Sequence, residues 1–315
     1  MSYSEDLIEI FPIHINQGYY NFRHMGEFEI FNSIGKGNFS EIFSAKQKNE
    51  IILEDSNKFN YAIKICKKNA IVDNNLDKAP PKKILFNEIC EIHLLNKIKN
   101  IENPNIIRMY DWDIDRETCE VRILMEYIPY DLKKYFSKKE NIEKLDEKLL
   151  KRIAFQILNG LNSLHKNRII HFNLNPENIL INGGTYSYMP IEGLLKTKKY
   201  SFSYDIWSLG CILLELLCRK NPFIGDDPED VLNNFISIYG LDAKYLTNFD
   251  EFCKNSCNLN YEKKRLVNYI KKNKKIKLIN DDLCDLISKM LSINPMNRIK
   301  AEEALKHSWF INYTK

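Results

Sequence analysis

The sequence changes character near residue 129, and this change constrains the fold more than any other feature. Before that point, short stretches rich in β-branched and aromatic residues alternate with polar segments, as in a small sheet. After it, apolar residues recur at spacings of three and four, which is the pattern of amphipathic helices. The pattern predicts an α+β fold, with a sheet in the first part and helices in the second. The expected strands are residues 28–34, 39–45, 59–66, 105–111 and 121–128.

One helix is expected beside the sheet, because apolar residues recur at helical spacing between residues 82 and 98. In the second part, the longest apolar face runs from Leu150 to Leu164, and Asp146 is its predicted N-cap. Another helix is predicted over residues 227–239, because Asp227 followed by proline is typical of a helix start. Further helices are expected at residues 201–219, 281–293 and 300–307.

The length and composition fit two lobes. A chain of 315 residues exceeds what one hydrophobic core usually organises, and 44% hydrophobic with 12% aromatic residues can fill two cores. We expect an N-terminal extension over residues 1–26 and a single domain over residues 27–310. Its lobes are predicted to be residues 27–128 and 129–310.

Charge, cysteine usage and hydropathy argue against several classes. The net charge of +4 is too small to predict a nucleic-acid binder, and no apolar run is long enough to span a membrane. The N-terminus carries no charged-then-apolar leader, so we expect a cytoplasmic or nuclear protein. The eight cysteines lack the spacing of a zinc site, which favours reduced core thiols over disulfides or metal.

One dense basic run breaks the even charge distribution, over residues 263–277. It is interpreted as a solvated surface insertion in a sequence rich in lysine and asparagine. An acidic partner, a nucleic-acid backbone or an import receptor are the alternatives that such a run leaves open.

Three motifs in the first part have the residue types of a nucleotide site. Residues 35–40 read Gly-Lys-Gly-Asn-Phe-Ser between two expected strands, and the bare backbone of Gly35 and Gly37 could close over phosphates. A plain glycine turn would explain this stretch by itself. Lys64 follows on the third strand, between apolar neighbours, and Glu91 lies on the expected helix. Glu88 is the rival for the helix position.

Taken in order along the chain, these motifs and four others resemble the protein kinase family. The others are Met125–Ile128, His171–Asn178, Asp205–Gly210, and Asn297–Ile299 followed by Ala301. The resemblance implies a bilobal fold, with a small five-stranded sheet lobe carrying one helix and a larger helical lobe.

The family pattern implies ATP as the nucleotide. It puts the adenine between Ile42, Ala62 and Leu180, and lets Lys64, paired with Glu91, meet the phosphates. Met125 corresponds to the residue that precedes the adenine-reading hinge. The residues that the resemblance assigns to the nucleotide are Gly35, Gly37, Ile42, Ala62, Lys64, Glu91, Met125, Glu126, Ile128 and Leu180.

The loop His171–Asn178 departs from the family pattern H-R-D-L-x-x-x-N at the residues that perform chemistry. Asn173 stands where the pattern has the aspartate base, and a neutral amide cannot take up a proton near pH 7. Asn175 stands where these kinases have a lysine that steadies the transferred phosphate. Of these three chemical positions, Asn178 alone keeps the residue of the family pattern, and it is the remaining candidate for a metal ligand.

The segment after this loop is short and carries no D-F-G motif, which would supply the second metal ligand. From His171 through Tyr204 the only carboxylates are Glu177 and Glu192. The resemblance turns Glu177 away from the cleft and pairs Glu192 with Arg298. Neither residue is expected to hold magnesium.

The sequence therefore predicts a pseudokinase: a scaffold or allosteric regulator that retains a weak ATP site, without magnesium, and acts on a protein partner. The rival is an active serine/threonine kinase, reached if a gene-model gap has removed a segment after Ile181 or if another group replaces Asn173. Substrates and oligomeric state are not encoded in these motifs.

Within the family, the chain is most similar to the catalytic subunit of casein kinase 2. The residues that carry this resemblance are the loop with Ser40 in third place, Pro104–Ile107, Tyr200–Cys211 and Arg219–Phe223. These stretches also belong to the wider group that includes the cyclin-dependent kinases.

Overall fold

Two compact units make up the chain in the computed structural model. One comprises Met1–Asn96 with Arg108–Tyr127, and the other Lys97–Ile107 with Ile128–Lys315. The structure describes residues 25–36, 40–48, 61–66, 94, 96–99, 101–114, 121–128, 131–180, 190, 201–225, 228–241, 259–276 and 279–311.

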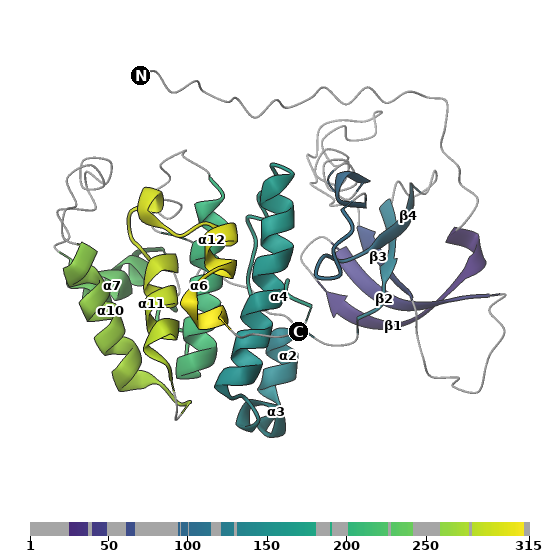
Figure 1. The fold of residues 1–315 in the computed structure, drawn as a ribbon. Helices are drawn as coiled ribbons and strands as arrows, with labels where there is room; N and C mark the ends of the chain where they lie inside the picture. Colours follow the sequence, from purple (N-terminus) through teal and green to yellow (C-terminus); the bar gives the residue numbers. More distant parts are fainter. Residues whose placement is uncertain are drawn as a thin grey trace, which may run out of the picture. The chain divides into compact units, whose positions relative to one another are not determined.

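The first unit contains a five-stranded antiparallel sheet with the strand order β1-β2-β3-β5-β4 (Figure 1). Ile63 and Leu124 belong to one small apolar cluster and Val121 and Ile123 to another, as alternation along a strand requires. The strands are β1 (Phe28–Lys36), β2 (Ser40–Gln47), β3 (Tyr61–Cys66), β4 (Met109–Ile114) and β5 (Val121–Glu126), and the short 3-10 helix η1 (Met25–Glu27) precedes them.

The predicted strand at residues 105–111 is wrong in its first half, because β4 begins only at Met109. Asn103 and Asn105 form a turn instead: the Asn103 side chain accepts a hydrogen bond from the Asn105 backbone N–H at 2.8 Å. The same side chain donates to Ser163 Oγ at 2.6 Å. Asparagine commonly bonds its own backbone two residues on, and this local bond outcompetes the strand. The other four expected strands are present, with ends that shift by at most two residues.

The second unit is helical, as predicted (Figure 1). Helix α6 lies at its centre and contacts α4, α10 and α11. Its elements are α2 (Leu132–Ser137), α3 (Lys139–Glu143), α4 (Glu147–Lys166), α6 (Ser203–Cys218), α7 (Pro228–Tyr239), α10 (Leu259–Asn273), α11 (Asp281–Met290), η3 (Pro295–Asn297), α12 (Ala301–Leu305) and η4 (Ser308–Phe310).

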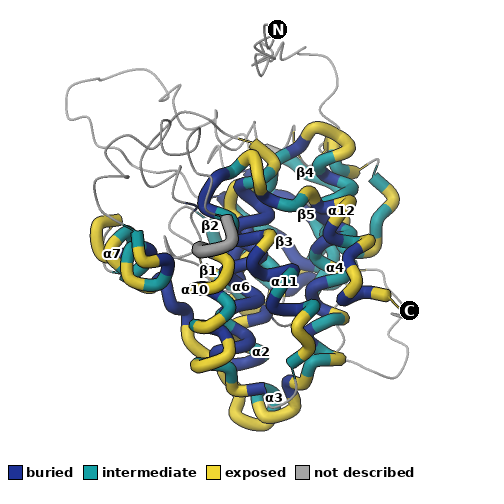
Figure 2. Tube along the Cα trace, turned by 60° about the vertical axis from the view of Figure 1, so that its left-hand side comes forward, coloured by how far each residue is buried: buried dark blue, intermediate teal, exposed yellow. Residues whose placement is uncertain are grey.

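Helix α6 is buried on nearly every side, which explains why its sequence is almost wholly apolar (Figure 2). Trp207 packs edge-on against Phe235 at 5.3 Å and stacks with Phe223 at 6.2 Å, measured between ring centroids. All three rings are at most 1% exposed. This aromatic cluster makes α6 a rigid base for the loops beside it.

The predicted N-cap of α4 is confirmed. The Asp146 side chain accepts a hydrogen bond from the Leu149 backbone N–H at 2.7 Å, and the helix runs to Lys166 with the expected apolar face buried. Helix α7 begins at Pro228 as expected, whereas its predicted cap, Asp227, lies outside the described residues. Helix α11 ends at Met290, three residues before the predicted end, and Asn280 caps its start.

The basic run contains a helix that the sequence reading did not predict. Helix α10 buries Leu266 and Ile270 against the core while most of its lysines face solvent, so the run is not an insertion outside the fold. Asp285 of α11 accepts hydrogen bonds from Lys263 of α10 and from Lys289 and His307. Burial alone would raise the pKa of Asp285, but these three donors hold it well below its usual range.

Of the predicted helix at residues 82–98, the structure describes Leu94 and Asn96 to Ile98, which are helical; its other residues lie outside the described part. Four cysteines are described, and each is buried with a free thiol: Cys66, Cys211, Cys218 and Cys284. In the described stretches, no helix combines the length and hydropathy needed to cross a bilayer.

Candidate active site

The loop His171–Asn178 follows α4 in the second unit and is tied to α6 by one buried carboxylate. Asp205, which is 0% exposed, accepts hydrogen bonds from the backbone N–H groups of His171 and Phe172, each at 2.9 Å. The His165 ring nitrogen Nε2 lies 2.9 Å from the same carboxylate. A buried carboxylate is tolerated only when its oxygens are satisfied in this way, so the loop and Asp205 stabilise each other.

Phe172 adopts the left-handed conformation, with a φ of 61°. Few residues other than glycine take up this conformation, because the Cβ atom crowds the backbone. The hydrogen bond from its N–H to Asp205 and a ring contact with Tyr204 at 5.5 Å offset that cost. The loop is therefore held in a backbone shape that its own sequence would not favour.

The His171 ring is a structural element of the loop. Burial lowers the pKa of His171, although the nearby Asp205 carboxylate opposes the shift, so the ring is neutral near pH 7. Its Nδ1 atom is buried and has no hydrogen-bond partner among the residues that the structure describes. A charged imidazole would be costly here.

The three asparagines of the loop bond to one another. Asn175, which is 5% exposed, donates from Nδ2 to Asn173 Oδ1 at 2.8 Å, and its own Oδ1 accepts the backbone N–H groups of Glu177 and Asn178. Asn178 Nδ2 donates to the Asn173 carbonyl oxygen at 2.8 Å. The amides therefore complete the loop's internal hydrogen bonding. An acceptor-only aspartate at 173 could keep the bond from Asn175, but it would add a charge that the amide lacks.

Glu177 is the only carboxylate in residues 171–180, and its side chain turns outward. It forms an exposed ion pair with Lys133 of α2 at 3.0 Å. Among the described residues, no group of three His, Cys, Asp or Glu side chains could hold a metal ion.

Strand register brings four of the predicted nucleotide residues to one face of the sheet. Ile42 pairs with Lys64, and Ala62 pairs with Met125. Ala62 and Lys64 are two positions apart on β3, so their side chains point to the same side, and cross-strand partners share that side. Gly35 pairs with Ile42 on the neighbouring strand. Lys64 therefore shares this face with the small and apolar side chains of Ala62, Ile42 and Met125.

The other predicted residues do not belong to this face of the sheet or lie outside the described residues. Glu126 forms two hydrogen bonds with the Arg108 backbone. Its N–H donates to the Arg108 carbonyl oxygen at 3.0 Å, and its side chain accepts the Arg108 N–H at 2.7 Å. Ile128 and Leu180 belong to the second unit. Gly37, Glu91 and its rival Glu88 lie outside the described residues, as does Glu192.

The profile of the family "Protein kinase domain" matches residues 28–184 and 182–310. The chain belongs to the protein kinase family. Two curated relatives agree with this. The chain is 28% identical to "Cyclin-dependent kinase 4" of Xenopus laevis, over 90% of its own length and 91% of the relative. It is 27% identical to a "Probable cyclin-dependent serine/threonine-protein kinase" of Dictyostelium discoideum, over 91% of its own length and 20% of that larger protein.

These relatives refine the family resemblance. Both relatives are named as cyclin-dependent kinases, the second as a probable one, and neither is named as a casein kinase 2 subunit. The cyclin-dependent kinases are part of the wider group already suggested by the motifs. The predicted bilobal α+β kinase fold is confirmed by the family match together with the sheet and helices described above. Protein kinase domains in general bind ATP, so the family match implies ATP binding in general.

The sequence reading missed the role of the Asp205 carboxylate in this kinase domain. Asp205 was recognised only as part of a motif at a helix start, and His165 was not singled out. A single aspartate in the apolar run of α6 was the available signal, since a charge is buried only where several donors meet it. The nearby Arg298 is anchored by the carbonyl oxygens of Ser292 and Ile293 and lies 4.6 Å from the Trp207 ring centroid.

Proposed function

We propose that this protein is a pseudokinase, a kinase-domain protein in which phosphotransfer is lost or strongly impaired and which acts as a scaffold or allosteric regulator. The observation that carries this is the state of the loop. Asn173, Asn175 and Asn178 use their amides to complete the loop's own hydrogen bonds, and Glu177 is turned away to Lys133.

The chemistry of phosphotransfer explains why a loop without a base or a metal-binding carboxylate should be inactive. In protein kinases, an aspartate base accepts the proton of the attacking hydroxyl group, and another aspartate holds the metal ion that neutralises the phosphate charge. A positioned base contributes about 100- to 10,000-fold to rate, and Asn173 has no proton affinity to offer near pH 7. The metal supplies several kcal/mol of charge stabilisation, and the sequence between His171 and Tyr204 carries no aspartate to hold it.

Nucleotide binding is a separate part of the proposal. ATP would meet the sheet face that carries Ile42, Ala62 and Lys64, with Gly35 and Gly37 over its phosphates and Glu91 beside Lys64. Met125, Glu126 and Ile128 would line the adenine edge, with Leu180 below the ring. Binding is expected to be weak and independent of magnesium, because Asn178 is the only metal ligand that the family pattern leaves.

A radioactive phosphotransfer assay tests the central claim. Purified protein is incubated with labelled ATP, magnesium and generic or acidic peptides, and the Lys64→Met variant serves as the control. We expect no transfer above that control. Transfer that depends on Lys64 would contradict the proposal and favour the rival, an active serine/threonine kinase, which the names of both relatives support.

A thermal shift assay tests nucleotide binding independently of catalysis. ATP is expected to raise the melting temperature by a similar small amount with and without magnesium, and Lys64→Met is expected to reduce the shift. A shift that requires magnesium would show that a metal site exists and would contradict that part of the proposal.

The remaining assignments rest on the sequence. We propose a kinase domain over residues 27–310, after an extension of residues 1–26, and a cytoplasmic or nuclear location with a protein partner. The family match over 28–184 and 182–310 supports the domain limits, and its two segments meet where the D-F-G motif is missing. A closer kinship with casein kinase 2 is carried only by the short motifs.

A further inference from the structure

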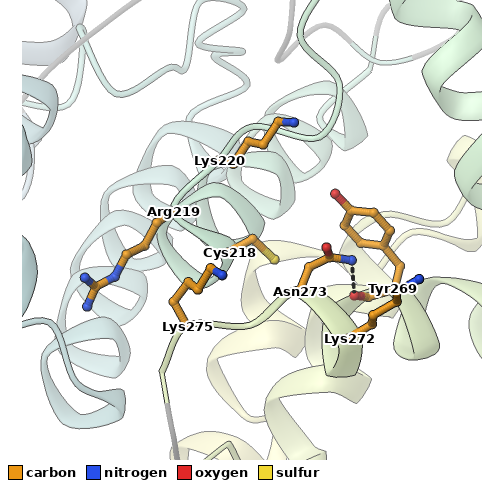
Figure 3. Close-up of a pocket in the computed structure, with 7 residues that line it drawn as sticks. All are labelled: Cys218, Arg219, Lys220, Tyr269, Lys272, Asn273 and Lys275. Carbon is orange, nitrogen blue, oxygen red and sulfur yellow. Dashed lines mark hydrogen bonds between the residues drawn. The ribbon is translucent and has the colours of Figure 1, made fainter.

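A basic pocket lies in the second unit at the point where two helices end (Figure 3). Its volume is about 610 Å³, within the usual size of ligand pockets. Cys218, Arg219 and Lys220 come from the end of α6 and the turn after it, while Tyr269, Lys272 and Asn273 come from α10 and Lys275 follows that helix. The site shares no residue with the catalytic loop.

The cations that line this pocket have no acidic partner within the described part of the chain. Many of the described lysines outside the pocket pair with a carboxylate, including Lys263 with Asp285 and Lys271 with Asp281. No carboxylate of the described residues forms an ion pair with the four cations that line the pocket: Arg219, Lys220, Lys272 and Lys275. All four residues are exposed, so they are free to meet a ligand from solvent.

Helix ends account for only part of this positive charge. The C-terminal ends of α6 and α10 each carry about half a negative charge, and cations near such ends are favourable. Two ends therefore offset roughly one of four positive charges, which leaves a surplus of about three. Burial raises the pKa of Cys218 to about 11, against a smaller effect of Lys275, so this thiol is neutral at pH 7 and adds no negative charge.

Arg219 lies at the edge of the pocket in an unusual backbone conformation. It is the C-cap of α6 in the left-handed region, with a φ of 55° and a ψ of 28°, where glycine is the common residue. An arginine at this position has a conformational cost that glycine would avoid. The sequence therefore keeps a cation at the pocket rim where chain geometry favours a residue with no side chain.

Figure 3 shows that the cationic side chains extend in different directions instead of converging on one point. The Lys220 side chain extends on the side of the Tyr269 ring, whereas the Arg219 guanidinium points away from it. A single small anion would reach only some of these groups. A short segment with several negative charges could contact them all.

We propose that this pocket binds an acidic segment of a partner protein, its charges supplied by aspartate and glutamate or by phosphorylated serine or threonine. The surplus of unpaired cations attracts the segment, and the cavity accepts side chains or phosphate groups between α6 and α10. The lining of this pocket suits a peptide better than a nucleic acid, because Tyr269 is its one aromatic residue and successive bases need several rings to stack on. This site is independent of ATP and of the state of the catalytic loop.

Fluorescence anisotropy of labelled peptides tests the proposal, with no nucleotide present. Three hexapeptides of one sequence frame carry aspartate, phosphoserine or asparagine at alternate positions. The aspartate or the phosphoserine peptide, or both, should bind the full chain, and the asparagine peptide should not. The difference between the first two identifies the source of the charge. Binding of none, or equal binding of all three, would overturn the proposal.

Charge-matched variants separate this pocket from general attraction. Lys272→Gln/Lys275→Gln removes two pocket cations, whereas Lys148→Gln/Lys264→Gln removes the same charge from exposed sites on α4 and α10 outside the pocket. The pocket variant should weaken acidic-peptide binding about tenfold, since each exposed pair contributes up to about fivefold, and the control less than about twofold. Equal weakening would overturn the assignment.

Two further measurements guard the interpretation. Arg219→Gly should weaken binding while leaving the melting temperature unchanged or higher, because glycine suits the left-handed cap. A labelled single-stranded oligonucleotide serves as the competing ligand. If it bound more tightly than either acidic peptide and lost affinity in the Lys272→Gln/Lys275→Gln variant, the pocket would be a nucleic-acid site and the proposal would be wrong.

Discussion

Replacing Asp205 by asparagine should destabilise the domain severely, although the two side chains have nearly the same shape. Asp205 receives three donors: the backbone N–H groups of His171 and Phe172 and the His165 ring. An asparagine offers one oxygen and one NH₂ group. Whichever way the amide is turned, at least one of the two backbone N–H groups faces another donor.

The magnitude follows from these contacts. Each hydrogen bond to a charged group contributes about 1.5–3 kcal/mol, and a buried N–H left unsatisfied costs about 1–3 kcal/mol. With one bond lost and the others weakened, we expect Asp205→Asn to lower the free energy of unfolding by about 3–5 kcal/mol. That is a large share of the 5–15 kcal/mol typical of a domain.

Urea denaturation followed by circular dichroism measures this loss, and hydrogen exchange should show faster exchange at His171 and Phe172. Asp146→Asn is the matched control, because its amide oxygen can still accept the Leu149 N–H as an N-cap, with a change within about 0.5 kcal/mol. If Asp205→Asn does not fold, His165→Ala removes only one donor and should cost about 1–2 kcal/mol. Equal denaturation midpoints for Asp205→Asn and Asp146→Asn would refute the reasoning.

Three further outcomes are expected. Gly160→Ala should lower the melting temperature despite the better helix propensity of alanine, because a Cβ atom at 160 would lie 2.9 Å from the Asn105 carbonyl oxygen; Gly26→Ala, with open space around it, should change little. Asn173→Asp should fold normally yet show no phosphotransfer in the labelled-ATP assay, because one carboxylate does not replace the missing metal ligand; activity in this variant would show that the base alone was lacking. The pKa of Asp285 is depressed in the folded state, so its stabilising contribution is present above about pH 4, the ordinary value, and lost as the pH falls below it; thermal melts from pH 6 to pH 3 should show less acid sensitivity in Asp285→Asn than in the natural chain.

The regular parts of the fold were predictable from local pattern. The apolar face from Leu150 to Leu164 and the Asp146 cap are local signals, and both appear in α4 as expected. The strand predicted from Asn105 began too early, because the Asn105 backbone N–H donates a hydrogen bond to the Asn103 side chain and forms a turn there. Hydropathy alone does not register such a bond.

Helix α10 and the loop anchor could not be predicted for a different reason. In α10, the buried residues Leu266 and Ile270 lie among many lysines. The high charge of the segment therefore obscured its apolar pattern. Asp205 accepts hydrogen bonds from residues more than thirty positions earlier in the sequence. Its role therefore depends on long-range contacts that form only in the folded chain. The predicted site residues on β2, β3 and β5 were brought together by strand register, which the sequence does not specify by itself.

The attachment of the catalytic loop to Asp205 separates the shape of the loop from its chemistry. Asp205 grips backbone N–H groups, which every residue except proline possesses, so the identity of the side chains at 173 and 175 is irrelevant to that grip. Mutations there can abolish a reaction while the scaffold endures. A kinase domain built in this way can lose its catalytic activity and still keep intact surfaces for binding other proteins.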